Sequence, residues 1–371
     1  MLIFIILQTG QSMLTFPLKP SSEPSDSYSH NTTSTYQAIL TLNNTGKNLS
    51  LVVDTASSWL VISQDSLGNE DPECEEKEGK QVIEVKGVDV EGKVCRVDLR
   101  FGSMVKNVQF FMSFKEFNQS DGVLGLGFSR LSKGFLPLVQ QIEENEFSLY
   151  IGKEVGSTSV LTIGGFSEDY GAEKISDINA YPHSGVWEVS IESVLIGEER
   201  AEVFLFGVIN SSSADLVFPE REFGVILSGF RNLLECQEST YITCNVTGFN
   251  LTNLPNLTLS IQNSNYILPA STFSHCTDQE CTFHISQHNK SHITLGLPFF
   301  LQFYLAFDLD LFTIQAYTSS THAGSGAYYT LYIIGIIVLG VIVSIPLCFW
   351  MMLSKIKGVA DKSPDYQRLT N

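Results

Sequence analysis

Positively charged residues are scarce in this chain of 371 residues. Lysine and arginine together number 22, against 40 aspartate and glutamate residues, and the formal net charge is −18. A surface this acidic has little with which to neutralise phosphate groups, so we expect no nucleic-acid partner. A high net charge keeps a protein soluble, but it does not identify what the protein binds.

Two kinds of catalytic or metal signature are also missing. No Gly-x-Ser-x-Gly sequence occurs, which argues against a serine hydrolase. The stretch 275–292 is rich in potential zinc ligands, but their spacing matches no recognised zinc signature, and exported thiols generally oxidise. We therefore expect neither a metal site nor a cofactor. The residues considered for zinc are Cys276, Cys281, His284, His288 and His292.

Before the last fifty residues, helical periodicity is rare. The one clear helix candidate there is 135–145. Short runs with alternating or continuous apolar residues dominate instead, such as YQAILTL at 36–42 and WEVSIESVLI at 187–196. These runs are rich in Val, Ile, Phe and Thr and are separated mostly by Gly or Asn, which favours an all-β fold. With 43% hydrophobic residues, the chain is long enough for two domains.

Charge is absent from residues 328–353, YYTLYIIGIIVLGVIVSIPLCFWMML. A bilayer core requires about 20 apolar residues, and this run exceeds that length. Aromatic residues lie near both ends, and Lys355 and Lys357 follow, as on the cytosolic side of a membrane. We predict a single transmembrane helix at 328–353, an extracellular or luminal part before it and a cytosolic tail at 354–371. A buried core helix is the alternative, which the length and lack of charge disfavour.

The two ends carry weaker signals. Residues 1–12 include MLIFIIL, a possible signal peptide that lacks a basic leader, and residues 13–34 are interpreted as a polar lead-in with little to bury. In the tail, the sequence from Tyr366 to Leu369 resembles a tyrosine-based sorting signal, through which sorting adaptors could bind. An unstructured tail without such a signal is the alternative.

Two counts support an extracytosolic domain. Six cysteines precede residue 328, an even number that permits complete pairing, although sequence alone leaves the pairing open. Nine Asn-x-Ser/Thr sequons are typical of a glycosylated surface. Asn210 matches this motif, but we expect it to be unmodified. The glycosylation candidates are Asn31, Asn43, Asn48, Asn118, Asn245, Asn250, Asn256 and Asn289.

The chain contains an internal repetition. DTASSWLVI (54–62) and NSSSADLVF (210–218) each begin with an Asx residue, continue with small hydroxyl residues and reach Leu-Val at the same offset. In the same order, VLGLGF (123–128) is echoed by TLGLPF (294–299). The repetition indicates two related β lobes, each with an Asx loop and a Leu-Gly-Leu segment.

Paired Asx loops suggest a specific chemistry. Two carboxylates held close together share one proton, because they cannot both ionise easily. The ionised member can activate a water as general base, while the protonated member polarises a peptide carbonyl. If each lobe contributes one loop, the two acids meet between the lobes.

These segments, with LTIGG (161–165) and YILPAST (266–272), resemble in order the landmarks of the pepsin-like aspartic peptidases over about residues 35–318. The resemblance implies a bilobal all-β fold, with lobes at 35–180 and 181–320, a peptide cleft between them and a hairpin flap over the cleft. It places Asp54 on the first catalytic aspartate and Ser57 on its supporting hydroxyl. It also places Gly125 and Gly296 beneath the two loops.

The chain departs from that family at three places. Ala56 replaces the glycine of the first loop, where the backbone N–H survives. Asn210 stands at the second catalytic aspartate, with Ser212 in place of glycine and Ser213 on the supporting hydroxyl. Val85 stands at the flap tyrosine. Asp215 is close to Asn210, but it occupies a position where an apolar strand residue is expected, so we do not expect it to act as the second acid.

The resemblance further implies a disulfide between Cys244 and Cys281. We expect Cys74–Cys95 and Cys236–Cys276 to complete the set, although sequence alone allows other pairings. The predicted function is a membrane-anchored, pepsin-like aspartic peptidase homologue that is catalytically impaired because Asn210 cannot cycle a proton. We expect it to retain a cleft for a peptide or protein ligand. The alternatives are a working membrane-anchored endopeptidase and a surface adhesion protein that uses only the exterior of the fold.

Overall fold

The computed structural model describes residues 13–21, 35–75, 80–85, 87–132, 135–153 and 157–320, which belong to one compact unit. Five predictions lie outside the described residues: the signal peptide at 1–12, the glycan at Asn31, the membrane helix at 328–353, the cytosolic tail at 354–371, and the sorting signal at Tyr366 and Leu369. Within the described ranges, no helix has the length and apolarity needed to cross a bilayer.

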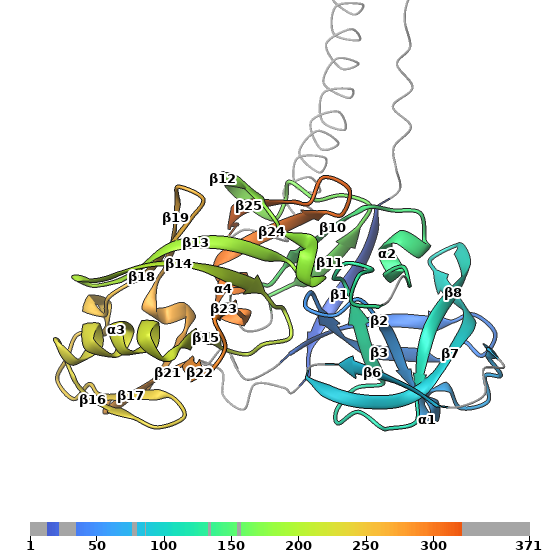
Figure 1. Cartoon of the computed structure of the whole chain (residues 1–371), viewed down its shortest axis with the longest axis horizontal. Coiled ribbons are helices and arrows are strands. Elements are labelled where there is room, and N and C mark those ends of the chain that lie inside the picture. Colours follow the sequence, from blue (N-terminus) through green and yellow to red (C-terminus); the bar gives the residue numbers. More distant parts are fainter. Residues whose placement is uncertain are drawn as a thin grey trace, which may run out of the picture. The chain divides into compact units, whose positions relative to one another are not determined.

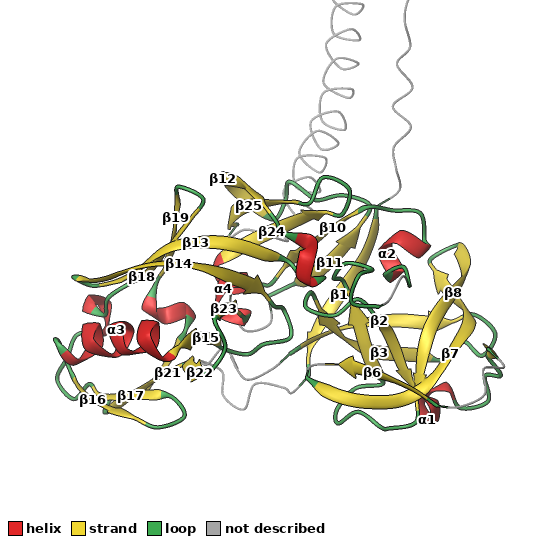
Figure 2. Cartoon of the chain, viewed as in Figure 1, coloured by secondary structure: helices red, strands yellow, loops and turns green. Residues whose placement is uncertain are grey.

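Strands dominate the described chain, as the alternating sequence pattern predicted (Figure 2). The largest sheet has 14 strands in the order β12-β25-β24-β10-β11-β1-β2-β3-β9-β4-β8-β7-β5, and β6 pairs with β7. Its strands are β1 (Leu14–Pro20), β2 (Tyr36–Leu42), β3 (Asn48–Asp54), β4 (Leu60–Ser63), β5 (Glu73–Cys74), β6 (Gln81–Val85), β7 (Val88–Phe101), β8 (Met104–Ser113), β9 (Gly122–Gly125), β10 (Glu146–Tyr150), β11 (Ser159–Ile163), β12 (Gly171–Asn179), β24 (Phe303–Asp308) and β25 (Thr313–Ser319).

A second sheet has seven strands, all between residues 188 and 295, in the order β19-β18-β13-β14-β23-β15-β22. Its strands are β13 (Glu188–Ile196), β14 (Glu199–Ile209), β15 (Leu216–Pro219), β18 (Leu257–Ile261), β19 (Ser264–Leu268), β22 (Ile285–His288) and β23 (His292–Leu295). A four-stranded sheet in the order β16-β17-β21-β20 comprises β16 (Glu235–Glu238), β17 (Ile242–Asn245), β21 (Glu280–Phe283) and β20 (Ser274–Cys276). Figure 1 shows β16, β17 and β21 beside helix α3 (Glu220–Arg231).

The prediction of a polar lead-in at 13–34 is wrong for its first part. Residues Leu14–Pro20 form β1, which pairs with β11 on one side and β2 on the other. Phe16 and Leu18 alternate with exposed residues and are buried in the core. The short stretch therefore has enough alternating apolar surface to be held between two strands.

Helices are few and short among the described residues. The candidate at 135–145 contributes only α2 (Leu138–Gln141). Helix α3 was not predicted, yet it buries Phe223, Ile226, Leu227 and Phe230, which recur at the spacing of one helix face. Its first turn carries Glu220 and Glu222 and its last carries Arg231, which suits the helix dipole. The other α-helices of the described residues are α1 (Gln64–Leu67) and α4 (Leu297–Gln302), and three single-turn 3-10 helices lie at Pro182–Ser184, Leu251–Asn253 and Ala270–Thr272.

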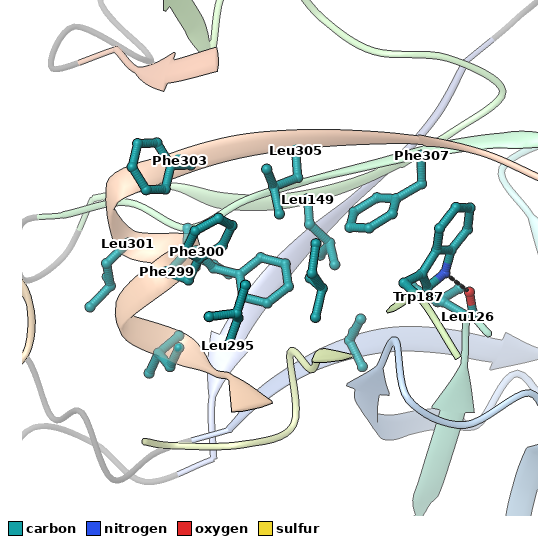
Figure 3. Packing of buried hydrophobic residues seen from close by; sticks show 14 of the residues in the cluster. Leu126, Leu149, Trp187, Leu295, Phe299, Phe300, Leu301, Phe303, Leu305 and Phe307 are labelled. Atoms are coloured by element: carbon teal, nitrogen blue, oxygen red, sulfur yellow. Dashed lines mark hydrogen bonds between the residues drawn. The ribbon is translucent and has the colours of Figure 1, made fainter. Parts of the chain in front are cut away.

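The end of the described chain returns to the large sheet. β24 pairs with β10 and β25 pairs with β12, so strands from beyond residue 300 complete a sheet begun by the first half. Trp187, fully buried, packs against Phe307 and Phe147. Its Nε1–H donates to the carbonyl of Leu126 at 2.9 Å (Figure 3). This contact joins the start of the second half to the segment that follows β9.

The predicted disulfide pairing is correct at one of three bonds. Cys74–Cys95 is confirmed, but Cys236–Cys276 and Cys244–Cys281 are wrong, because the structure joins Cys236 to Cys244 and Cys276 to Cys281. β16 and β17 are antiparallel neighbours with Cys236 directly opposite Cys244, and β20 and β21 place Cys276 opposite Cys281. Strand register, which sequence did not reveal, brings these four cysteines next to one another, with Cys244 also opposite Cys281.

Candidate functional site

The two Asx loops meet at the ends of strands from the two halves of the chain. Asp54 ends β3, and Asn210 follows β14. Reciprocal hydrogen bonds join the next residues: the Thr55 N–H donates to Ser211 Oγ at 3.1 Å, and the Ser211 N–H donates to Thr55 Oγ1 at 3.0 Å. Each hydroxyl then donates across to the opposite strand, Thr55 to the carbonyl of Ile209 and Ser211 to that of Val53. The structure therefore brings Asp54 and Asn210 into one site.

Glycines pack closely against both loops, as the family resemblance implied. A Cβ on Gly125 would lie 2.6 Å from the backbone nitrogen and oxygen of Trp59, in the first loop. A Cβ on Gly296 would collide with the carbonyl oxygens of Asp215 and Ser213, in the second loop. Only glycine permits backbone to pass this close to backbone.

The first loop holds a buried carboxylate. Asp54 is 1% exposed, and the Ala56 N–H donates to its Oδ1 at 2.9 Å. The backbone donor therefore survives the replacement of glycine by alanine, as expected. Ser57 is also buried in this loop, and its backbone carbonyl accepts a hydrogen bond from the Gly127 N–H at 2.7 Å. The supporting role of the Ser57 hydroxyl stays a prediction.

In the second loop, Ser212 fixes the orientation of the Asn210 amide. The Ser212 N–H and the Ser212 hydroxyl both donate to Asn210 Oδ1, each at 2.9 Å. Because a backbone N–H can only donate, the atom facing it is the amide oxygen, and the side chain presents its NH2 group away from Ser212. The Ser213 hydroxyl donates to the carbonyl of Asp215 at 3.0 Å, and its predicted support of residue 210 stays untested.

Asp215 belongs to a polar cluster that sequence reasoning did not identify. Its Oδ1 lies 3.3 Å from Nδ1 of His284, and both side chains are largely buried. The ring of Tyr241 packs edge-on against that of His284. Burial raises the pKa of Tyr241, and the charge and hydrogen bond of Asp215 raise it further. A charged residue at an apolar strand position was the available signal for this cluster.

The hairpin of β6 and β7 occupies the place of the predicted flap. Val85 pairs with Val88 at its tip, and the Val85 side chain is buried in an apolar cluster with Trp59, Val61 and Ile83. A cavity of about 350 Å³ lies between this hairpin and the first loop. Its lining residues are Ala56, Ser57, Ser58, Trp59, Val82, Ile83, Glu84 and Leu131. Trp59, which the sequence did not single out as a site residue, thus forms one wall of the cavity.

The remaining candidates are those considered for zinc binding and for glycosylation. Among described residues, no group of three or more His, Cys, Asp or Glu side chains could hold a metal ion. Cys276 and Cys281 are bonded to each other, so they are not zinc ligands in this structure. Asn43 is half-buried, and the other described glycosylation candidates are exposed: Asn48, Asn118, Asn245, Asn250, Asn256 and Asn289.

Comparison with known proteins supports the resemblance. The family model described as eukaryotic aspartyl protease matches residues 78–318, which include the second loop. The chain is similar to a probable vacuolar protease A of Trichophyton verrucosum, with 30% identity over 34% of this chain and 36% of that protein. It is 22% identical to pepsin A of Gallus gallus over 62% of each chain. Against pepsin A of Suncus murinus it is 22% identical over 82% of this chain and 74% of that protein. The chain therefore spans less than two thirds of the length of the first two of these relatives.

Proposed function

The chain belongs to the eukaryotic aspartyl protease family, and from that premise we propose that it binds peptides between its two Asx loops without hydrolysing them efficiently. The observation that carries this proposal is Asn210, an amide at the start of the loop that is hydrogen-bonded to the Asp54 loop through Thr55 and Ser211. The pepsin-like fold, the paired loops and the glycines beneath them are all present, while the second acid is replaced.

Hydrolysis of a peptide bond by this kind of site requires two acids in different protonation states. One carboxylate takes a proton from water and later passes it to the leaving amine, and the other, protonated, donates its proton to the peptide carbonyl and recovers it when the intermediate collapses. An amide can donate a hydrogen bond, but it neither gains nor loses a proton in the relevant pH range. Asp54 can therefore orient a water, but no second carboxyl group is present at residue 210 to complete the proton cycle.

The same arrangement suits binding without cleavage. The Asn210 NH2 group can donate to a peptide carbonyl, while the Asp54 carboxylate can accept from a peptide N–H. The cavity of about 350 Å³ beneath the β6–β7 hairpin offers an apolar wall, Trp59, and a polar one, Ser57 and Ser58. An extended peptide with a hydrophobic side chain facing Trp59 is the ligand class that fits these groups.

The test is a paired cleavage and binding assay on the full chain in detergent micelles. We expect no pepstatin-sensitive cleavage of labelled, denatured protein between about pH 3 and pH 7. We also expect pepstatin, a peptide-like inhibitor, to bind, and Asp54→Asn to weaken that binding. Cleavage that disappears in Asp54→Asn would show a working endopeptidase. Absence of both cleavage and pepstatin binding would contradict a peptide-binding cleft and favour use of the exterior of the fold.

We further propose that the chain is a single-pass type I membrane glycoprotein with its folded part in a luminal or extracellular space. The support is the uncharged run at 328–353 with Lys355 and Lys357 after it, together with the three disulfides and the exposed sequons. Two relatives are named vacuolar proteases. In cells, we expect the protein to resist alkaline carbonate extraction and to shift in mass on glycosidase treatment. Release by carbonate, or no mass shift, would contradict the respective part of the proposal.

A further inference from the structure

Two histidines lie at one end of the seven-stranded sheet, where β22, β15 and β23 run next to one another (Figure 1). His288 ends β22 and is directly opposite Pro219 on β15. On the other side of β15, Val217 is opposite Thr294 in an antiparallel pair, and the same register two residues further along sets His292, the first residue of β23, beside Pro219. Residues opposite one another share a face of the sheet, so both imidazoles lie on the same face.

The separation of the two imidazole rings is that of two ligands on one metal ion. The ring centroids of His288 and His292 are 5.1 Å apart, and the ring planes are inclined at 73°. In a zinc–histidine bond the metal lies about 2.0–2.1 Å from the ring nitrogen, and therefore about 3.2 Å from the ring centroid. Two such rings at the tetrahedral angle have centroids about 5 Å apart.

The neighbours of the pair in this row are apolar. Phe206 on β14 is opposite His292, and Pro219 has neither a backbone N–H nor a polar side chain. Among the described residues, both ring nitrogens of His288 are buried and neither has a hydrogen-bond partner. Buried polar atoms in folded proteins nearly always have a partner, so an unpaired imidazole indicates a ligand that the chain itself does not supply.

The shielding of these nitrogens favours a metal ion over a water molecule as that ligand. Water approaches a ring nitrogen to about 2.9 Å, whereas zinc approaches to about 2.1 Å and therefore fits a smaller space. His288 and His292 are each half-buried, and residues 289–291 between them are exposed. An ion can therefore enter from the side of this turn.

We propose that His288 and His292 form a two-histidine site for a late first-row divalent metal ion, which we assign as zinc. Imidazole nitrogen is a preferred ligand of zinc, and water fills the remaining two positions of a tetrahedral ion. A pair is smaller than the groups of three or more His, Cys, Asp or Glu side chains that could hold a metal, of which the described residues have none. The spacing of the histidines in the sequence matches no zinc signature, because β15 lies between the two strands that carry them.

The bound ion acts as a clamp. It ties β22 to β23 across the end of β15, and so joins three strands at one point. β23 continues into Gly296, which packs against the backbone of the second Asx loop. The clamp therefore stabilises a strand on which that loop rests, and it does so whether or not the protein binds peptides.

The experiment measures zinc binding by the full chain in detergent micelles, purified without a histidine tag. In isothermal titration calorimetry, we expect His288→Gln and His292→Gln each to weaken binding at least about tenfold, because a chelate needs both rings. His275→Gln is the control, because His275 is exposed and lies on β20 in another sheet. It should bind zinc as the wild type does. Equal zinc affinity of the wild type and His292→Gln would overturn the proposal.

Thermal unfolding gives a second readout. Zinc at about a hundredfold excess over its Kd should raise the unfolding temperature of the wild type by about 4 °C, and calcium, which prefers oxygen ligands, should not. The same zinc shift in the variant that lacks both histidines would overturn the proposal, because the ion would then act elsewhere. A calcium shift equal to that of zinc would contradict imidazole ligands. Should His288→Gln fail to fold, His292→Gln decides the result.

Discussion

The first Asx loop (54–62) and the second (210–218) share a backbone plan but differ in side-chain chemistry. Each exchanges a hydrogen bond with the other through Thr55 and Ser211, and each has a glycine passing beneath it. At the fifth position after the Asx residue, however, Trp59 packs against Phe111 and Phe135, whereas Asp215 contacts His284. The two loops therefore share their backbone contacts but differ in the side chains that they carry.

This difference separates the requirements of folding from those of catalysis. The reciprocal hydrogen bonds and the glycine contacts are buried, so losing them leaves polar groups unpaired or atoms overlapping, which destabilises the fold. Replacing one of two adjacent carboxylates by an amide has no such cost, because it removes a repulsion between like charges. A chain released from catalysis can thus lose the acid while keeping the loop.

The glycines offer the largest test of the shared backbone plan. We expect Gly296→Ala to destabilise the protein by about 3 kcal/mol or more, since the added Cβ collides with backbone oxygens of the second loop. Gly125→Ala should cost slightly less, because its contacts begin at 2.6 Å. Thermal unfolding measures both. Gly224→Ala in α3 is the matched control, because nothing lies within 4 Å of its Cβ position. An unfolding temperature for Gly296→Ala equal to that of Gly224→Ala would refute the close passage.

Replacing Asn210 by aspartate tests whether residues 54 and 210 interact electrostatically. In Asn210→Asp, two carboxylates share the site, and the pKa of one member rises above its unfolded value. The proton that this carboxyl group holds in the folded protein stabilises the fold at pH values below the unfolded pKa. That stabilisation is lost as the pH rises through the folded pKa. We expect the variant to be less stable than wild type by on the order of 1 kcal/mol at neutral pH, and this difference to shrink in acid.

Denaturant titrations at several pH values measure this effect. Asp54→Asn combined with Asn210→Asp restores a single carboxylate, so its neutral-pH penalty should disappear. If the single and double variants have the same pH profile, residues 54 and 210 are not electrostatically coupled, and the proposed site is wrong.

The smallest expected effect concerns the polar cluster that only the second loop has. Asp215→Asn removes a charge that raises the pKa of Tyr241, so that pKa should fall, although burial, the larger cause, remains. Difference absorbance of tyrosinate, with Tyr241→Phe subtracted, follows this titration. Trp59→Leu in the first loop should leave it unchanged. An unchanged Tyr241 titration in Asp215→Asn would show that the carboxylate does not act on the phenol.

Much of the site was predictable because its signals are local. The Asx loops and the Leu-Gly-Leu segments are short sequence motifs that occur twice in the same order. This repetition is visible in the sequence alone. β1 and α3 were missed although their sequences carry the patterns: Phe16 and Leu18 alternate, and Phe223, Ile226, Leu227 and Phe230 follow helical spacing. The prolines and serines near β1 hid its alternating pattern. Pro219 and the strands around α3 hid the helical spacing of that segment.

Sequence by itself determined the all-β class and the repeated Asx loops that begin at Asp54 and Asn210, because side-chain identity and short-range pattern are written directly in the chain. The tertiary structure alone decided which cysteines bond and that Asp215 meets His284. These depend on strand register and on contacts between distant segments. A shift of a single residue in register would change every one of these partners while leaving the local sequence pattern the same.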